Sequence, residues 1–310
     1  MKHLVLTPCS RRKRVQAEPA LCASALKPAR LDQVAGAWAA RVRRADLKVP
    51  AEKLYAGRGL VEARRAAQAL GADLCIVSAG LGLISSREAV PAYSLTVASG
   101  DCDSVADKVQ DSFSAGRWWQ ALHRSLGKPE GAIRRLLSRS DGIAILALPG
   151  TYLDLLAEEL AVLPADMLDR LRLVGPPRAA VPAPLAHLRM PYDARFDGTG
   201  GPNPGTRGDF AQRAARHFAE TIILAASSAD ARTHADMVER CLAPLSASAP
   251  SRREAGTDAE LIAAIRDILP QSGGRSAETL RLLRHHAGRA CEQGRFRRLF
   301  AAATRGGLIA

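Results

Sequence analysis

Three carboxylates stand near turns rich in small residues and are the best candidates for chemistry in this 310-residue chain. Glu88 follows a short apolar run and a glycine turn, whereas Asp193 and Asp197 lie in a long stretch rich in glycine and proline. A carboxylate can stabilise the oxocarbenium-like sugar formed when an N-glycosidic bond breaks, or can activate a water molecule. We therefore predict a site for glycosidic-bond cleavage in which one of these three residues is catalytic.

Small-residue turns after apolar runs provide the other parts of the predicted pocket. Glycines at such turns let the backbone approach a ligand closely and leave N–H groups free to bind it. Tyrosine side chains could form the walls of a pocket that holds a base flipped out of a duplex. The predicted substrate-binding residues are Pro8, Cys9, Ser10, Tyr55, Ser78, Gly80, Gly82, Tyr93, Gly150, Thr151 and Tyr152. Two alternatives remain open, namely that the stretch 75–95 has no chemistry and that Tyr55 only caps the core.

The chain is strongly basic, with a formal net charge of +13. Such a balance usually indicates a polyanionic partner, and arginine carries most of the excess. The alternative is a compositional drift toward arginine and alanine, which explains the alanines better than the clustering of charge. The residues predicted to contact DNA phosphates are Arg11, Arg12, Lys13, Arg195, Arg207, Arg281, Arg284, Arg289, Arg295 and Arg298.

Several motifs of other protein classes are missing from the sequence. There is no Gly-x-x-x-x-Gly-Lys phosphate loop and no Gly-x-Gly-x-x-Gly fingerprint, and the histidines and cysteines lack zinc-ligand spacing. We therefore expect no cofactor and no metal. The six cysteines are predicted to be free thiols. The sequence shows neither a signal peptide nor an apolar run of membrane-spanning length. The expected location is the cytoplasm, without contact to a membrane.

Four apolar runs alternate with helical patterns along the first part of the chain. The runs cover residues 3–7, 74–77, 142–148 and 171–174. Strands that alternate with helices predict an α/β fold, here a mostly parallel sheet of about four strands with helices on both faces. Ligands of such folds bind at the carboxyl ends of the strands. The turns named above follow three of these runs.

Composition divides the chain into two domains. Residues 244–256 are rich in serine, alanine and proline and are predicted to be a linker. Residues 1–243 would form the catalytic α/β domain, and residues 257–310 a small, basic helical module that binds nucleic acid. A solvated helix bundle is the alternative for the module. Within the first domain, residues 176–207 are predicted to be a functional loop, with disorder as the alternative.

Two motifs carry a resemblance to a known family. Residues 7–13 read Thr-Pro-Cys-Ser-Arg-Arg-Lys, and the run ending at Ser78 continues into Gly80-Leu81 and then Tyr93-Ser94-Leu95. This pattern resembles the signature shared by the YaaA peroxide-stress family and the "CSxRK" proteins, which covers about the first half of the chain. One departure is the order Pro91-Ala92-Tyr93, where the family usually has Pro-Tyr.

The resemblance implies a fold and an activity. It implies a uracil-DNA-glycosylase-like α/β fold and, by likeness to bacterial antiphage glycosylases, a monofunctional DNA glycosylase acting on double-stranded DNA with modified bases. Glucosylated hydroxymethylcytosine of phage DNA is the base that it implies, and an abasic site is the product. The alternatives are a non-catalytic DNA-binding stress protein of the YaaA kind and a tRNA-base transglycosylase.

Overall fold

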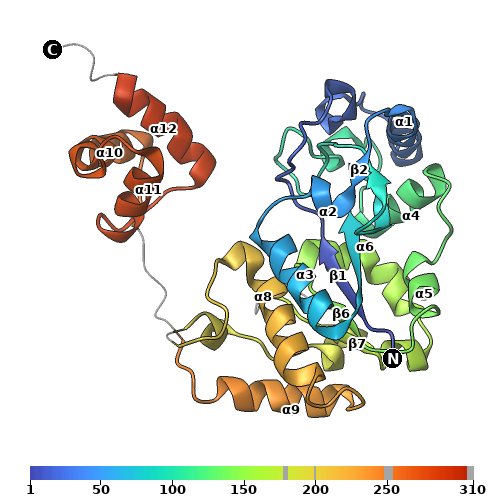
Figure 1. The fold of residues 1–310 in the computed structure, drawn as a ribbon. Coiled ribbons are helices and arrows are strands. Elements are labelled where there is room, and N and C mark those ends of the chain that lie inside the picture. The colour runs from blue at the N-terminus through green and yellow to red at the C-terminus, as the bar shows by residue number, and fades with distance from the viewer. Residues whose placement is uncertain (177–180, 199, 248–253, 306–310) are drawn as a thin grey trace. The chain divides into compact units, whose positions relative to one another are not determined.

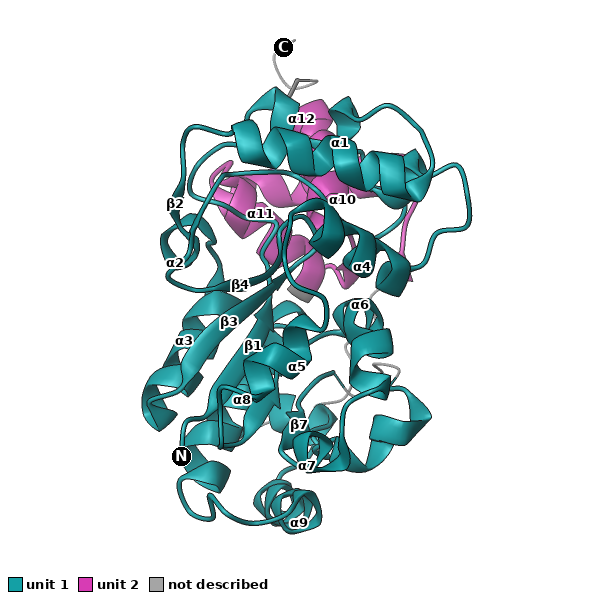
Figure 2. Ribbon diagram, turned by 90° about the vertical axis from the view of Figure 1, so that its right-hand side faces the viewer, with its two compact units in different colours: residues 1–248 teal, residues 249–310 magenta. Residues whose placement is uncertain are grey.

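A computed structural model describes residues 1–176, 181–198, 200–247 and 254–305 of the chain. The chain forms two compact units, residues 1–248 and 249–310 (Figure 2). The boundary between them lies inside the predicted linker 244–256. The described residues contain no helix that is both long and apolar enough to cross a bilayer.

The first unit is built on a five-stranded sheet with the order β4-β3-β1-β6-β7 (Figure 1). Its strands are β1 (Leu4–Pro8), β3 (Asp73–Ser78), β4 (Gly82–Ser85), β6 (Ala144–Leu146) and β7 (Leu171–Leu173). The strands β3, β1, β6 and β7 are parallel, and β4 runs antiparallel to β3. The prediction of an α/β fold with a mostly parallel sheet is confirmed. The predicted number of about four strands missed β4, a four-residue strand directly after the glycine turn.

Helices cover both faces of this sheet. The α-helices of the first unit are α1 (Leu31–Arg44), α2 (Ala51–Leu54), α3 (Arg58–Leu70), α4 (Ala115–Ser125), α5 (Ala132–Leu137), α6 (Gly150–Ala161), α7 (Ala165–Leu168), α8 (Phe210–His217) and α9 (Ala231–Leu242). A π-helical stretch, Phe218–Ile223, continues α8. The 3₁₀ helices are Pro19–Leu21, Ala23–Ala25, Ala106–Lys108, Ala183–Leu188, Ala194–Asp197 and Arg207–Asp209. Two short strands, β2 (Val49–Pro50) and β5 (Ala89–Val90), pair with each other outside the main sheet.

The sheet reverses its winding direction between β1 and β6. The chain leaves β1 through α3 to reach β3 on one side, whereas it leaves β6 through α6 to reach β7 on the other side. Because such crossovers are right-handed, α3 and α6 must lie on opposite faces of the sheet. The helix α8 packs against α3. The carboxyl ends of β1 and β6 therefore border a crevice of the kind in which α/β proteins bind ligands.

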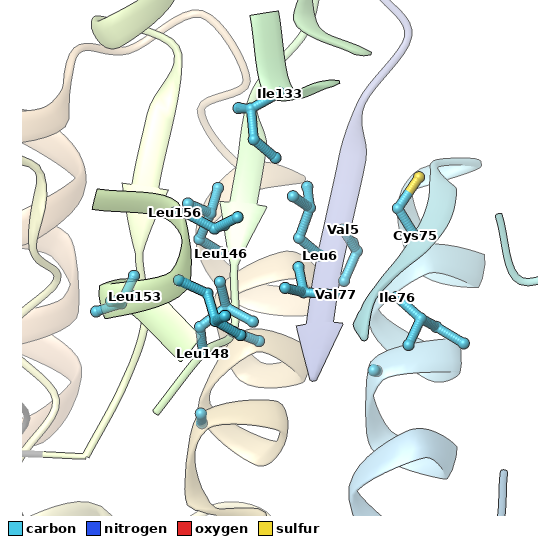
Figure 3. Close-up of a cluster of buried hydrophobic side chains, with 14 of the residues drawn as sticks. Val5, Leu6, Cys75, Ile76, Val77, Ile133, Leu146, Leu148, Leu153 and Leu156 are labelled. Carbon is cyan, nitrogen blue, oxygen red and sulfur yellow. The ribbon is translucent and has the colours of Figure 1, made fainter. Parts of the chain in front are cut away.

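The strands are apolar on both sides because both faces of the sheet are covered. Val5 and Leu6 of β1 are fully buried, as are Ile76 and Val77 of β3. Figure 3 shows these side chains together with Leu153 and Leu156 of α6, which pack over Leu146. Burial of one such side chain contributes about 1.5–3 kcal/mol. The core thus fixes the strand ends that carry the candidate site.

The second unit is a small helical domain with its own core. It contains α10 (Asp258–Ser272), α11 (Ser276–His285) and α12 (Gln293–Arg305), and the two-residue strands β8 (Glu254–Ala255) and β9 (Arg289–Ala290) pair in parallel. Thr257 and Glu260 form a capping box at the start of α10. The core residues are Leu261, Ile265, Ile268, Leu282, Leu283, Cys291, Phe296, Leu299 and Ala303.

Candidate functional site

A pocket of about 350 Å³ lies at the carboxyl end of β1. The residues that follow β1, the first turn of α3 and the start of α8 line it. Pro8, Cys9 and Ser10 are among the lining residues, as the sequence predicted, and so is the buried Tyr55. The pocket lies on the β1 side of the crevice at which the sheet reverses its winding, and a ligand in it would contact segments far apart in sequence.

Asp209 is the carboxylate of this pocket, and only 4% of the residue is exposed. Its Oδ1 accepts hydrogen bonds from Arg213 Nε at 2.6 Å and from the backbone N–H of Thr206 at 2.8 Å. Its Oδ2 lies 3.4 Å from Arg58 Nε. Because donors hold it on two sides, the carboxylate is fixed in the wall of the pocket. A fixed negative charge at this place can stabilise a developing cation or orient a water molecule.

Arg213 organises the surroundings of Asp209. This arginine is fully buried, and besides Asp209 it binds Asp197 Oδ1 at 2.7 Å. It also donates to the carbonyl oxygens of Asn203 and Thr206, both at 2.9 Å. The guanidinium thus ties Asp197, Asn203 and Thr206 to α8. Asp197 is therefore a partner of the arginine that holds Asp209, and it does not line the pocket.

Gln212 is the second buried polar side chain of the pocket and is 4% exposed. Its Nε2 donates to the carbonyl oxygen of Ala147 at 3.1 Å and reaches Thr7 Oγ1 at 3.4 Å. The Ala147 carbonyl can only accept a hydrogen bond, so the amide nitrogen must face it. The orientation of the amide is thereby fixed, with Oε1 on the side of α3.

The amino end of α3 forms another wall of the pocket. Gly57 precedes the helix and has no side chain that could cap it. Within the described part of the chain, no acceptor takes the backbone N–H of Gly59 or Leu60, and both residues line the pocket. Uncapped N–H groups of a first turn carry partial positive charge and bind acceptors of a ligand.

The turn after β3 is part of the core and does not line the pocket, contrary to the prediction. The N–H groups of Gly80 and Leu81 donate to Ser78 Oγ at 3.3 Å and 3.0 Å, so they are not free for a ligand. The indoles of Trp38 and Trp118 bind the carbonyl oxygens of Gly80 and Ala79. Like its neighbours in the turn, Gly82 is buried.

Tyr93 packs against this turn and is 1% exposed. A Cβ on Gly80 would lie 2.6 Å from its ring, so glycine is required for the close approach. The Tyr93 hydroxyl lies 2.6 Å from Ser78 Oγ and 3.0 Å from the Tyr55 hydroxyl. Burial raises the pKa of both tyrosines well above its usual value. Tyr93 packs behind Tyr55, and of the two only Tyr55 lines the pocket.

Lys13 lies against the same two tyrosines, although we expected it to contact phosphate. Its Nζ is 4.3 Å from the centroid of the Tyr93 ring and 5.6 Å from that of Tyr55. It donates to the carbonyl oxygen of Ser10 at 3.2 Å. Burial lowers the pKa of Lys13, because it disfavours the charged form. The ammonium stabilises the loop after β1 by cation–π contact.

The other cations of that loop remain at the surface. Arg11 lines the pocket, its side chain is 84% exposed, and it pairs with Asp101 at 2.7 Å. Arg12 is exposed. Both stay available for phosphate, because an exposed ion pair contributes little and can exchange partners.

Gly150, Thr151 and Tyr152 begin α6 and are not among the residues that line the pocket. Thr151 is exposed. Tyr152 Oη lies 3.1 Å from Cys9 Sγ, which joins the residues following β6 and β1 across the crevice. Tyr152 therefore positions a lining residue from outside the pocket.

Glu88 lies away from the site because β4 carries the chain back along β3. Ser85, at the end of β4, is opposite Cys75 near the amino end of β3. The Glu88 side chain is 42% exposed and pairs with Lys128 at 3.4 Å. The expectation that Glu88 is near the glycine turn and the strand end was wrong, since it assumed a loop where a strand turns back.

Asp193 and Arg195 neutralise each other on the surface. Arg195 Nε lies 2.9 Å from Asp193 Oδ2, and its other nitrogens bind the Glu239 carboxylate at 2.7 Å and 2.9 Å. Neither Asp193 nor Arg195 lines the pocket. Arg207 is exposed beside the start of α8, where it could reach a phosphate.

Most of the arginines predicted to contact phosphate in the second unit already bind an acceptor within the protein. Arg281 pairs with Glu278, Arg289 with Glu254 and Arg295 with Asp258. Arg284 donates to the carbonyl oxygen of Cys291 at 2.7 Å. Arg297 and Arg298 are exposed on α12, and no acidic partner is found for them among the described residues. Arg297 and Arg298 thus place two accessible positive charges next to each other on α12.

Asp101, Cys102 and Asp103 are close enough together to hold a metal ion. However, Asp101 pairs with Arg11, and Asp103 Oδ1 accepts the N–H of Ser24 at 2.9 Å. Protein donors thus already use these carboxylates.

Sequence reasoning missed Asp209, Gln212 and Arg58 as site residues. Asp209 also has a local role, since Thr206 and Asp209 form a capping box. A signal was present in the segment 207–213, where one carboxylate, one amide and two arginines follow a glycine-rich stretch. Comparison with protein-family models, curated proteins and solved structures finds no match to this chain.

Proposed function

We propose that the chain is a DNA glycosylase that flips out a modified base and excises it, leaving an abasic site. The observation that carries the proposal is Asp209, a buried carboxylate in a pocket that also holds the buried amide Gln212 and the uncapped end of α3. The motif resemblance implies a uracil-DNA-glycosylase-like domain and a role in defence against phage. It also implies glucosylated hydroxymethylcytosine as the base.

In the proposed reaction, the bond between C1′ and the base nitrogen breaks, and the base leaves with the bonding electrons. Positive charge develops on the sugar, and the Asp209 carboxylate stabilises it. A water molecule then adds to C1′ and loses a proton, and the base gains one. Arg213 holds the Asp209 carboxylate in place through these steps, because its Nε donates to Asp209 Oδ1.

The direct test is to incubate the protein with ordinary DNA and with DNA that carries glucosylated hydroxymethylcytosine. Alkali-labile abasic sites in the modified DNA support the proposal. Binding without any change in the DNA would favour the stress-protein alternative. Exchange of a base in tRNA would favour the transglycosylase alternative.

The accessible charge on α12 leads to a prediction about salt dependence. Each phosphate contact contributes about −0.9 to the slope of log K against log salt. Replacement of both Arg297 and Arg298 by glutamine should therefore make the slope for duplex DNA shallower by about two units. Binding measured by fluorescence anisotropy at several salt concentrations checks this.

Arg289→Gln, which removes a cation paired with Glu254, is the matched control and should change the slope less. An unchanged slope in the double variant would remove α12 from the interface.

We also predict that the protein does not cut the strand by imine chemistry. Strand cleavage by a lyase needs an amine that can form a Schiff base with the sugar. No lysine is among the residues that line the pocket, and Lys13 Nζ is covered by two tyrosine rings. Borohydride reduction during turnover should trap no covalent adduct, as judged by gel mobility. A trapped adduct that disappears in Lys13→Ala would contradict both the position of Lys13 and the water mechanism.

A further inference from the structure

The floor of the pocket presents one free acceptor beside free donors. Gln212 Oε1 receives no hydrogen bond from the described residues, although the side chain is almost fully buried. A Cβ placed on Gly59 would lie 3.2 Å from this oxygen, so Oε1 and the first turn of α3 are direct neighbours. The backbone N–H groups of Gly59 and Leu60 are the donors.

Neither Gln212 Oε1 nor the N–H groups of Gly59 and Leu60 can easily gain a hydrogen-bond partner within the protein by a local rearrangement. Rotation of the Gln212 amide would turn Oε1 toward the Ala147 carbonyl and leave two acceptors facing each other. The N–H groups of a first helical turn have no partners within their own helix. The pair is therefore open toward the pocket and complementary to a ligand that carries a hydrogen-bond donor beside an acceptor.

An inorganic anion does not fit this arrangement well. The helix end would attract it, but Oε1 would repel it at close range because both are acceptors. A nucleobase does fit, since its Watson–Crick edge carries an N–H group next to a carbonyl oxygen or a ring nitrogen. Enzymes that flip bases read this edge in their pockets.

We infer that Gln212 Oε1 and the amino end of α3 read the Watson–Crick edge of the base in this pocket. The base donates an N–H to Oε1 and accepts a hydrogen bond from the first turn of α3. Phosphate then lies at the mouth of the pocket, near Arg11 and Arg58. This inference deepens the proposed function and rests on it for the identification of the ligand as a base.

The test measures binding and requires no cleavage. The full chain is titrated with the four deoxynucleosides by calorimetry, and each one that binds is compared with its derivative methylated at the edge nitrogen. N3-methylthymidine and N4,N4-dimethyldeoxycytidine are two such probes. Methylation should weaken binding about tenfold or more, because it leaves a buried acceptor without its donor.

Two variants locate the effect. In Gln212→Leu the acceptor is gone, so parent and methylated nucleosides should bind equally weakly, whereas Gln68→Leu on the outer part of α3 should keep the full discrimination. Since Gln212→Leu also removes a bond to Ala147, Gly59→Ala provides a second variant. It keeps the glutamine and narrows the space beside Oε1, and it should weaken binding of the parent nucleoside.

The inference is overturned if methylation has no effect, or if no deoxynucleoside binds the wild-type chain at millimolar concentration. It stands if binding depends on the N–H group even when no DNA yields an abasic site, in which case only the proposed cleavage fails. Conversely, abasic sites formed equally well by wild type and Gln212→Leu would support the cleavage and overturn this reading of the base.

Discussion

Asp209→Asn should lower the rate of base release by roughly two to four orders of magnitude, the range found for groups that act directly on a reacting centre. Asparagine keeps the shape of the side chain and an oxygen that can accept the N–H of Thr206. It removes the negative charge that would stabilise the sugar cation. Single-turnover release of the modified base from duplex DNA is the measurement, with DNA binding measured in parallel.

Two matched variants separate the role of Asp209 from that of other carboxylates. Glu88→Gln and Asp193→Asn alter acids that lie outside the pocket, and both should retain release rates close to wild type. A variant Asp209→Asn that folds, binds DNA and still releases the base at the wild-type rate would refute the proposed role. Loss of activity in Glu88→Gln alone would show that the reaction takes place elsewhere.

Arg213→Met should lower the free energy of unfolding by about 3–5 kcal/mol, the usual cost of breaking a buried ion pair by removal of one partner. Methionine fills much of the same space, so the loss of charge and hydrogen bonds is the main effect. The buried Asp209 would lose its closest cation, and two backbone carbonyls would lose their donor. Urea unfolding followed by circular dichroism measures the change.

Arg207→Met is the control for Arg213→Met, since Arg207 is an exposed cation in the turn that precedes the same helix. It should change the free energy of unfolding by no more than about 0.5 kcal/mol. If Arg213→Met costs less than the control, Asp197, Asn203 and Thr206 must be held by contacts other than this arginine. If it costs the expected amount, the activity of the folded fraction then shows how far Arg213 also positions Asp209.

The sequence was sufficient to predict the parallel strands of the sheet but not the site. Apolar runs such as 142–148 predict buried strands because each run is long enough to span a covered sheet and is bounded by turn residues. The pocket depends on which strands are neighbours and on the face that each helix covers. Those relations bring Gln212 next to Ala147, 65 residues away, and no local pattern encodes such a contact.

The error over Glu88 has a similar origin. A strand of four residues between a glycine turn and a polar turn gives almost no periodic signal, so Gly82–Ser85 was not recognised. Once that strand runs back along β3, its end at Ser85 lies opposite Cys75, and Glu88 follows it away from the carboxyl end of β3. The motif around Cys9 does line a pocket, and it directly follows a strand whose end can be located without knowledge of the topology.

All three tryptophans of the chain, Trp38, Trp118 and Trp119, are buried in the first unit, and all four tyrosines are there as well. The second unit contains neither residue type, so its unfolding is silent in intrinsic fluorescence, whereas its three helices contribute to the far-ultraviolet circular dichroism. A denaturation experiment followed by both signals thus resolves the two units without any label. Superimposable curves would mean that they unfold together, and a dichroism transition without change in emission would belong to residues 254–305.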